Sequence, residues 1–233
     1  MEKYNHQQRY LIAVDSIIFG FDGKELKLLL IHRGFEPEIG KWSLMGGFVE
    51  PTESLEMAAA RILKKLTGLS GVFMEQLHTF GNPDRDPVER TVSVTYYALI
   101  DIHQYEMQLS HNYHPEWVSL KKIPDLIFDH EHMVTIAKSR LREKSTVHPV
   151  LFELLPEKFT LPVLQNLYES VFEKEFDKRN FSRKVLSSGL LMKTKDKEKA
   201  GSKKGAFYYK LDKKKYRTQF ASFLNFIPTQ NTQ

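Results

Sequence analysis

Cysteine is absent from the 233-residue sequence, which excludes disulfide bonds and cysteine-ligated zinc. No apolar run approaches the roughly 20 residues of a membrane-spanning helix, and residues 1–7 lack the apolar core of a signal peptide. The nine histidines are scattered and none forms an H-x3-H pair, so nothing in the sequence supports a metal centre. These absences predict a cytoplasmic protein with no membrane partner, no metal and no cofactor.

Acidic residues are scarce in the second half of the chain. Residues 148–233 carry 17 lysines and arginines against 9 aspartates and glutamates, whereas residues 1–147 carry 17 against 20. Within residues 178–217 the imbalance rises to 15 against 3. Such a dense positive charge is expected of a segment that binds nucleic-acid phosphates. Because 41% of the residues are hydrophobic, the chain can also bury a substantial core, and its length allows two domains.

A glycine turn followed by one strongly patterned helix, residues 46–69, lies at the centre of the first half. Gly46 and Gly47 permit a tight turn, and Glu53 stands in the first helical turn, where a carboxylate complements the helix dipole. Gly68 ends the helix. The apolar positions recur at i, i+3, i+4 and i+7 and predict one buried face, made of Leu55, Ala58, Ala59, Ile62, Leu63 and Leu66.

The same stretch resembles the Nudix box, G-x5-E-x7-R-E-U-x-E-E-x-G-U, where U is a bulky apolar residue. Its frame is present at the family's offsets as Gly47, Glu53, Arg61, Leu63, Gly68 and Leu69. In Nudix hydrolases, the three glutamates of the R-E-U-x-E-E portion hold divalent metal against a pyrophosphate. Here Ile62, Lys65 and Leu66 occupy those positions, and none of them can hold a cation.

The altered box implies a Nudix scaffold that has no catalytic residues and is not an enzyme. Three acids nearby leave an alternative open, a surviving hydrolase that uses Glu50, Glu53 and Glu56. Magnesium-dependent turnover of a nucleoside diphosphate compound would establish that alternative.

Apolar or alternating segments around the helix predict five strands, at residues 10–21, 26–31, 72–80, 91–100 and 116–120. A further helix is expected from Phe128 to about Leu141. His130 and His132 are two residues apart and do not share a helix face, so helix capping and surface positions are predicted for them. The Nudix resemblance implies that these elements form an α/β/α sandwich with a mixed sheet.

The second half carries the longest resemblance, to the Nudix-related transcriptional regulators. Residues 149–186 contain LLP, FTLPVLQNLYESV and DKRNFSRKVL, which are similar to that family's C-terminal motifs. Thr160 is a candidate cap for a helix with one apolar face, and a second helix would point Phe181, Val185 and Leu186 inward. The resemblance implies an α+β protein with a degenerate Nudix domain at residues 1–146 and a winged helix-turn-helix at residues 147–233.

The second helix of that pair has the composition of a recognition helix, because arginine can pair with guanine, asparagine with adenine, and lysine with phosphate. Residues 190–193 and 206–211 read as a hairpin wing with a lysine-rich tip. We therefore predict double-stranded operator DNA as the partner and RNA as the alternative. The candidate DNA-binding residues are Lys178, Arg179, Asn180, Ser182, Arg183, Lys184, Lys203 and Lys204.

The resemblance also implies a homodimeric repressor that a small molecule releases from DNA. Regulators of this family sense a pentose such as arabinose in sugar catabolism, or ADP-ribose-like metabolites in NAD control. The altered loop after Pro87 and an insertion after the strand at residues 91–100, which contains His103, His111 and His114, favour the sugar branch, with the ADP-ribose branch as the alternative. The candidate effector-binding residues, chosen because rings stack on tryptophan and arginine pairs with hydroxyls or phosphates, are Arg33, Trp42, Arg61 and Arg85.

Overall fold

The structure is a computed structural model that describes residues 6–105, 108–109, 113–198 and 205–216. The chain divides into two compact units, one up to Leu154 and one from Leu155 onward. Residues 147–154, which the sequence assigned to the second domain, therefore pack with the first unit. In the described ranges no helix combines the length and apolarity that crossing a membrane requires.

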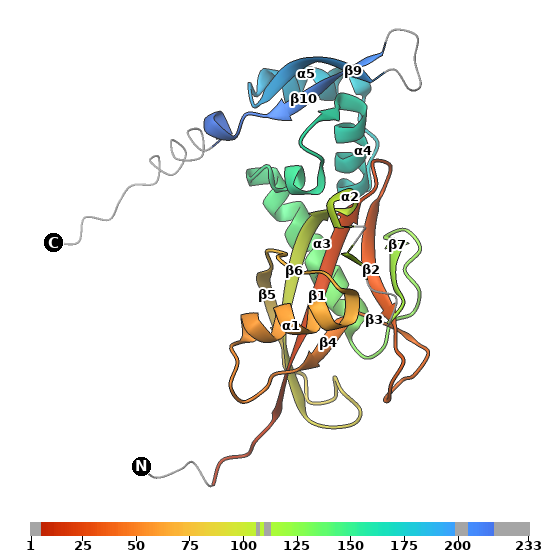
Figure 1. The fold of residues 1–233 in the computed structure, drawn as a ribbon, viewed down its shortest axis with the longest axis vertical. Coiled ribbons are helices and arrows are strands. Elements are labelled where there is room, and N and C mark those ends of the chain that lie inside the picture. The colour runs from red at the N-terminus through yellow and green to blue at the C-terminus, as the bar shows by residue number, and fades with distance from the viewer. Residues whose placement is uncertain (1–5, 106–107, 110–112, 199–204, 217–233) are drawn as a thin grey trace, which may run out of the picture. The chain divides into compact units, whose positions relative to one another are not determined.

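The first unit is built on a seven-stranded mixed sheet (Figure 1). Its main path runs β3-β2-β1-β6-β5, while β4 pairs with β1 and β7 pairs with β2. The central strand β1 is antiparallel to β2 and β4 and parallel to β6 along its whole length. The strands are β1 (Leu11–Phe21), β2 (Leu26–His32), β3 (Trp42–Ser43), β4 (Met45–Phe48), β5 (Glu75–Phe80), β6 (Thr91–Asp101) and β7 (Pro115–Ser119).

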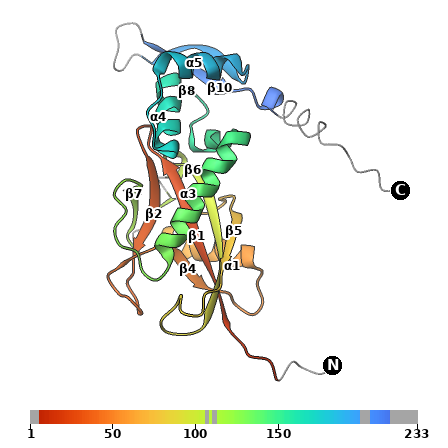
Figure 2. The same ribbon diagram turned by 180° about the vertical axis from the view of Figure 1, so that it is seen from behind.

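Helices cover both faces of this sheet, which confirms the predicted sandwich. Helix α1 (Leu55–Thr67) lies before the sheet in Figure 1, and α3 (His130–Val147) lies before it in the reverse view of Figure 2. Strand β1 is buried on both faces from Ala13 to Phe21 because each face meets a helix layer. A short helix α2 (Ile102–Tyr105) follows β6, and a 3-10 turn, η2 (Val150–Leu154), ends the unit.

Helix α1 follows the predicted pattern closely. The Ser54 side chain caps its start by accepting a hydrogen bond from the Met57 amide, and Gly68 ends it in the left-handed conformation with φ of 84°. Its apolar residues pack into the core with Val14 and Ile18 of β1. The sequence periodicity thus gave the face that the helix buries, whereas Glu53, which was expected in the first turn, precedes the Ser54 cap and Glu56 takes that place.

The second unit contains a helix pair and a three-stranded sheet in the order β8-β10-β9, which confirms the predicted winged helix-turn-helix. The ring of Tyr168 on the first helix lies 5.6 Å from the ring of Phe181 on the second, so these aromatic residues join the two helices. The elements are β8 (Phe159–Thr160), α4 (Leu161–Phe172), α5 (Lys178–Ser187), β9 (Leu191–Glu198) and β10 (Ala206–Leu211).

Two local predictions in this unit were wrong. Thr160 stands at the start of α4, but its buried hydroxyl makes no hydrogen bond and does not cap the helix. Leu186 was expected to point inward and is instead 43% exposed, because Phe181 alone supplies the buried contact of α5. The cap that does form is at α5, where Asp177 accepts a hydrogen bond from the Asn180 amide at 2.7 Å.

Candidate functional sites

Helix α5 presents a basic surface with little internal pairing. Ser182 is half-buried, and the other predicted contact residues on the helix, Lys178, Arg179, Asn180, Arg183 and Lys184, are exposed. Within the described ranges, none of the cations on this helix has a carboxylate at ion-pair distance. Arg183 instead donates to the side-chain oxygen of Asn180 at 2.8 Å. The helix therefore offers positive charge and amide groups that are available to a duplex.

The wing beside this helix is longer than predicted. Strand β9 continues to Glu198, so that several lysines expected at a loop tip lie on the strand. The side chains of Lys193 and Lys197 both lie over the ring of Phe207 on β10. Lys203 and Lys204, predicted to contact DNA, lie outside the described residues.

In the first unit, the positions of the missing Nudix acids have become part of the fold. Ile62 and Leu66 are buried on α1, and Lys65 is exposed. A methyl group added at Gly47 would lie 2.9 Å from the Ile62 side chain, so the glycine leaves the space that the isoleucine fills. Restoring a carboxylate at position 62 would therefore place a charge in the core.

The acids that remain near the box are engaged in internal bonds. Arg61 donates to both oxygens of Glu53, at 2.8 Å and 2.5 Å, and to the backbone oxygen of Phe48 at 3.0 Å. These hydrogen bonds from Arg61 lower the pKa of Glu53 to about 2. Glu56 accepts from Ser54 and from Tyr96. No group of three residues suited to a metal ion occurs among the described residues.

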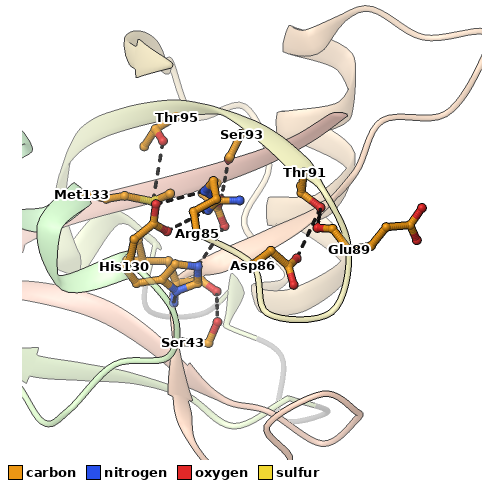
Figure 3. Close-up of polar contacts among 12 residues, drawn as sticks. Ser43, Arg85, Asp86, Glu89, Thr91, Ser93, Thr95, His130 and Met133 are labelled. Carbon is orange, nitrogen blue, oxygen red and sulfur yellow. Dashed lines mark hydrogen bonds and ion pairs between the residues drawn. The ribbon is translucent and has the colours of Figure 1, made fainter. Parts of the chain in front are cut away.

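Arg85, predicted to bind the effector, lies at the centre of a buried polar network (Figure 3). Its guanidinium donates to the two oxygens of Asp129 at 3.0 Å and 2.8 Å and lies 3.7 Å from Asp15. Asp15 in turn accepts from the hydroxyl of Ser93 at 2.5 Å. The network thus joins the loop that carries Arg85 to β1, β6 and the start of α3.

His130 belongs to the same network, and the prediction of a capping or surface role was wrong. Its Nδ1 accepts from the Leu44 amide at 3.2 Å, and its Nε2 lies 3.4 Å from Asp15. This pairing places the proton on Nε2 in the neutral ring. Burial lowers the pKa of His130 below its usual value, and the charges of Arg85 and Arg33 add to that effect against the opposing aspartates.

A hollow of about 600 Å³ opens beside this network. Its size suits a small-molecule ligand. Arg85 lines it, whereas Arg33, Trp42 and Arg61 do not. The lining residues come from β5, the loop after it, the start of α3 and the loop before β3, and they are Glu38, His78, Thr79, Phe80, Gly81, Asn82, Asp84, Arg85, Pro87, Phe128, Asp129 and His132.

The remaining effector candidates have local partners. Arg33 donates from Nε to the Pro37 oxygen at 2.7 Å, and its guanidinium lies 4.2 Å from the centre of the Phe35 ring. The Trp42 ring lies 3.6 Å from the ring of His32. The sequence did not identify Asp15, Ser93 or His130 as members of this buried network. The sequence feature that pointed to it is the carboxylate of Asp15, which interrupts the apolar run of β1.

Two protein families match the chain. The NUDIX domain family matches residues 9–137, and the NrtR DNA-binding winged helix domain family matches residues 151–211. The first matched segment lies within the first compact unit, and the second covers most of the second unit and begins four residues before it.

Individual relatives cover most of the chain. The ADPR responsive transcriptional repressor NtrR of Acinetobacter baylyi is 36% identical over 220 residues, spanning 93% of this chain and 88% of that protein. The crystal structure of Shewanella oneidensis NrtR complexed with a 27mer DNA is 33% identical, with a TM-score of 0.73, and the match covers 86% of this chain and 93% of that one.

A third relative concerns the ligand. The NUDIX domain of Shewanella oneidensis NrtR complexed with ADP ribose is 32% identical, with a TM-score of 0.51, over 60% of this chain and 94% of that one. These relatives support a ligand-responsive DNA-binding repressor. They favour the ADP-ribose alternative over the arabinose interpretation drawn from the sequence.

Proposed function

Because the chain belongs to the NrtR family of regulators, which join a Nudix domain to a winged helix domain, we propose that it is a repressor whose grip on operator DNA is controlled by ADP-ribose. The observation that carries the proposal is the contrast between the two charged helices. On α5 the cations are exposed and, among the residues that the structure describes, have no carboxylate at ion-pair distance, whereas on α1 the positions of the family's metal-binding acids hold Ile62, Lys65 and Leu66.

The proposal treats the Nudix domain as a sensor without hydrolase activity. Mg²⁺ needs several carboxylate oxygens at one place. Glu53 is held by Arg61, and Glu56 is hydrogen-bonded to Ser54 and Tyr96. With Ile62 in the core, the remaining acids cannot rebuild the cluster that holds metal against a diphosphate.

The hollow beside Arg85 is the place we propose for the uncharged end of the effector. Phe80 and Phe128 offer ring surfaces for a base or a ribose, and Asn82 offers an amide for hydroxyl groups. Arg85 is already neutralised by Asp129, so this hollow does not by itself supply a cation for the diphosphate. We propose Arg33 and Trp42 as further contacts outside the hollow.

Effector binding can alter DNA affinity only if the ligand prefers one arrangement of the protein over another. The bond between Arg85 and Asp129 links the wall of the hollow to the first residues of α3. A ligand that displaces the Arg85 loop would therefore change the support of that helix, which is the last helix before the second unit.

The test is operator binding measured by fluorescence anisotropy, with duplex DNA taken from the protein's own gene neighbourhood. We expect saturable binding that ADP-ribose weakens at least about tenfold and arabinose leaves unchanged. Release by arabinose alone would support the sugar interpretation instead. Double-stranded RNA of matched length serves as the nucleic-acid control, and tighter binding of the RNA would contradict the proposal.

Two further measurements accompany it. Incubation with ADP-ribose and Mg²⁺ should give no hydrolysis above the rate without protein, and sustained turnover would establish the hydrolase alternative.

We also propose a homodimer, since a two-fold symmetric protein matches two operator half-sites. Light scattering of the free protein should give twice the mass of one 27.2 kDa chain.

A further inference from the structure

The wing holds two lysine ammonium groups over one aromatic ring. Lys193 Nζ lies 3.5 Å, and Lys197 Nζ lies 4.4 Å, from the centre of the Phe207 ring. The face of an aromatic ring attracts cations, but two cations on one ring also repel each other. The ring therefore keeps two like charges together that would otherwise separate.

A shift in strand register produces this arrangement. Tyr209 pairs with Lys193, so a regular antiparallel ladder would place Lys195 opposite Phe207. The ladder is irregular between Phe207 and Tyr209, and Phe207 pairs with Lys197 instead. Extra residues on β9 thus bring Lys197 directly across from the ring, while Lys193 reaches the same ring from the pair beside it.

The carboxylate on this part of β9 is engaged elsewhere. Asp196 lies 2.6 Å from Lys158 Nζ, and the hydrogen bond from Lys158 lowers the pKa of Asp196. The Asp196 amide donates to Thr194 Oγ1 at 3.3 Å within the irregular segment. In the part of the chain that the structure describes, neither Lys193 nor Lys197 has a carboxylate at ion-pair distance.

We infer that Lys193, Lys197 and Phe207 form a clamp for the phosphate backbone of duplex DNA, called the Phe207 clamp below. A phosphate within reach of both ammonium groups would offset their repulsion, and both lysines are exposed to receive it. The ring acts as a positioning group that holds the cations in place before DNA arrives. The inference rests on the proposed DNA-binding function and names the site on the wing that carries it.

The salt dependence of binding tests the clamp, because each neutralised phosphate steepens the plot of log affinity against log salt by about 0.9. The full chain is titrated with labelled operator and with an unrelated duplex over a series of NaCl concentrations. Replacing both Lys193 and Lys197 by alanine should make the slope less steep by roughly 2 on both duplexes. Lys210→Ala is the matched control, since Lys210 lies 2.5 Å from Glu157, and its slope should stay close to that of the wild type.

Two more variants separate the roles of the ring and of Asp196. Phe207→Leu keeps apolar bulk and both lysines, and it should make the slope less steep by roughly 1. Lys158→Ala frees the Asp196 carboxylate and should weaken binding to both duplexes about threefold or more, while adding Asp196→Asn should restore it. Circular dichroism checks folding, and if Phe207→Leu does not fold, the lysine variants decide.

The clamp is overturned if the double lysine variant keeps the wild-type slope, or if Lys210→Ala changes the slope as much. Failure of the wild-type protein to prefer the operator would count against the proposed function instead. Because every DNA sequence has the same backbone phosphates, the salt slopes on the unrelated duplex would still show in that case whether the clamp binds phosphate.

Discussion

Helices α1 and α5 are both rich in charged residues and use that charge in opposite ways. On α1, Arg61 is hydrogen-bonded to Glu53 and to the backbone oxygen of Phe48. The positions that hold metal-binding glutamates in Nudix hydrolases are occupied here by buried apolar residues or by a lysine. On α5, the cations remain exposed, and Arg183 donates a hydrogen bond to the neutral side-chain amide of Asn180. Charge that is paired within the fold stabilises a scaffold, whereas charge left without a partner is available for binding.

The sharpest test of paired against exposed charge is to replace one buried, paired arginine of the first unit and one exposed arginine of the second unit by alanine. Arg85→Ala should lower the free energy of unfolding by about 3–5 kcal/mol, because it leaves the buried carboxylate of Asp15 and the partly buried carboxylate of Asp129 without their cation. Arg179→Ala on α5 should change it by no more than about 0.5 kcal/mol, since that side chain is exposed. Chemical denaturation measures both values, and equal losses would contradict the contrast.

Substitutions on α5 that barely change the stability of the protein should change its affinity for DNA. Arg183→Ala should weaken operator binding by about 1–3 kcal/mol if the guanidinium contacts a base edge, and the loss should be concentrated on one base pair of the operator. The unfolding free energy should stay near the wild-type value. Anisotropy titrations with singly substituted operators measure the effect. A uniform loss on every operator would assign Arg183 to the phosphate backbone instead.

The buried network makes the first unit sensitive to acid. His130 has a folded-state pKa below its usual value of 6.5, so the folded protein takes up a proton less readily than the unfolded chain. Its contribution to stability is complete above pH 6.5 and is lost as the pH falls from 6.5 through the folded-state pKa. Denaturation at pH 7.5, 6 and 5 should show this loss, and His130→Gln should reduce it. The same pH dependence in both proteins would exclude His130 as its origin.

The smallest effect is expected at the exposed box position. Lys65→Glu restores one acid of the Nudix pattern, and the free energy of unfolding should change by no more than about 0.5 kcal/mol because the side chain faces solvent. Hydrolysis of ADP-ribose with Mg²⁺ should remain absent, since Ile62 and Leu66 are buried and apolar. A gain of turnover in this variant would show that the scaffold needs fewer acids than metal chemistry predicts.

Most of the architecture could be predicted from local patterns. The periodicity of Leu55 to Leu66 gave α1 and its buried face, and the motif around Lys178 to Leu186 gave helix α5. The wing was less predictable, because the register shift that pairs Lys197 with Phe207 depends on how two strands meet. Lys195 and Lys197 were expected in the tip of the hairpin and instead lie on β9.

The sequence by itself determined the class of the protein, because the spacing of the Nudix frame, the replaced acids and the basic helix are all local features of the chain. Only the tertiary structure decided what Arg85 and His130 do. Asp129 lies 44 residues from Arg85, Leu44 lies 86 residues from His130, and Ser93 lies 78 residues from Asp15. Contacts at such separations leave no periodic signal, since the packing of sheet and helix brings the partners together and the resulting burial lowers the pKa of His130.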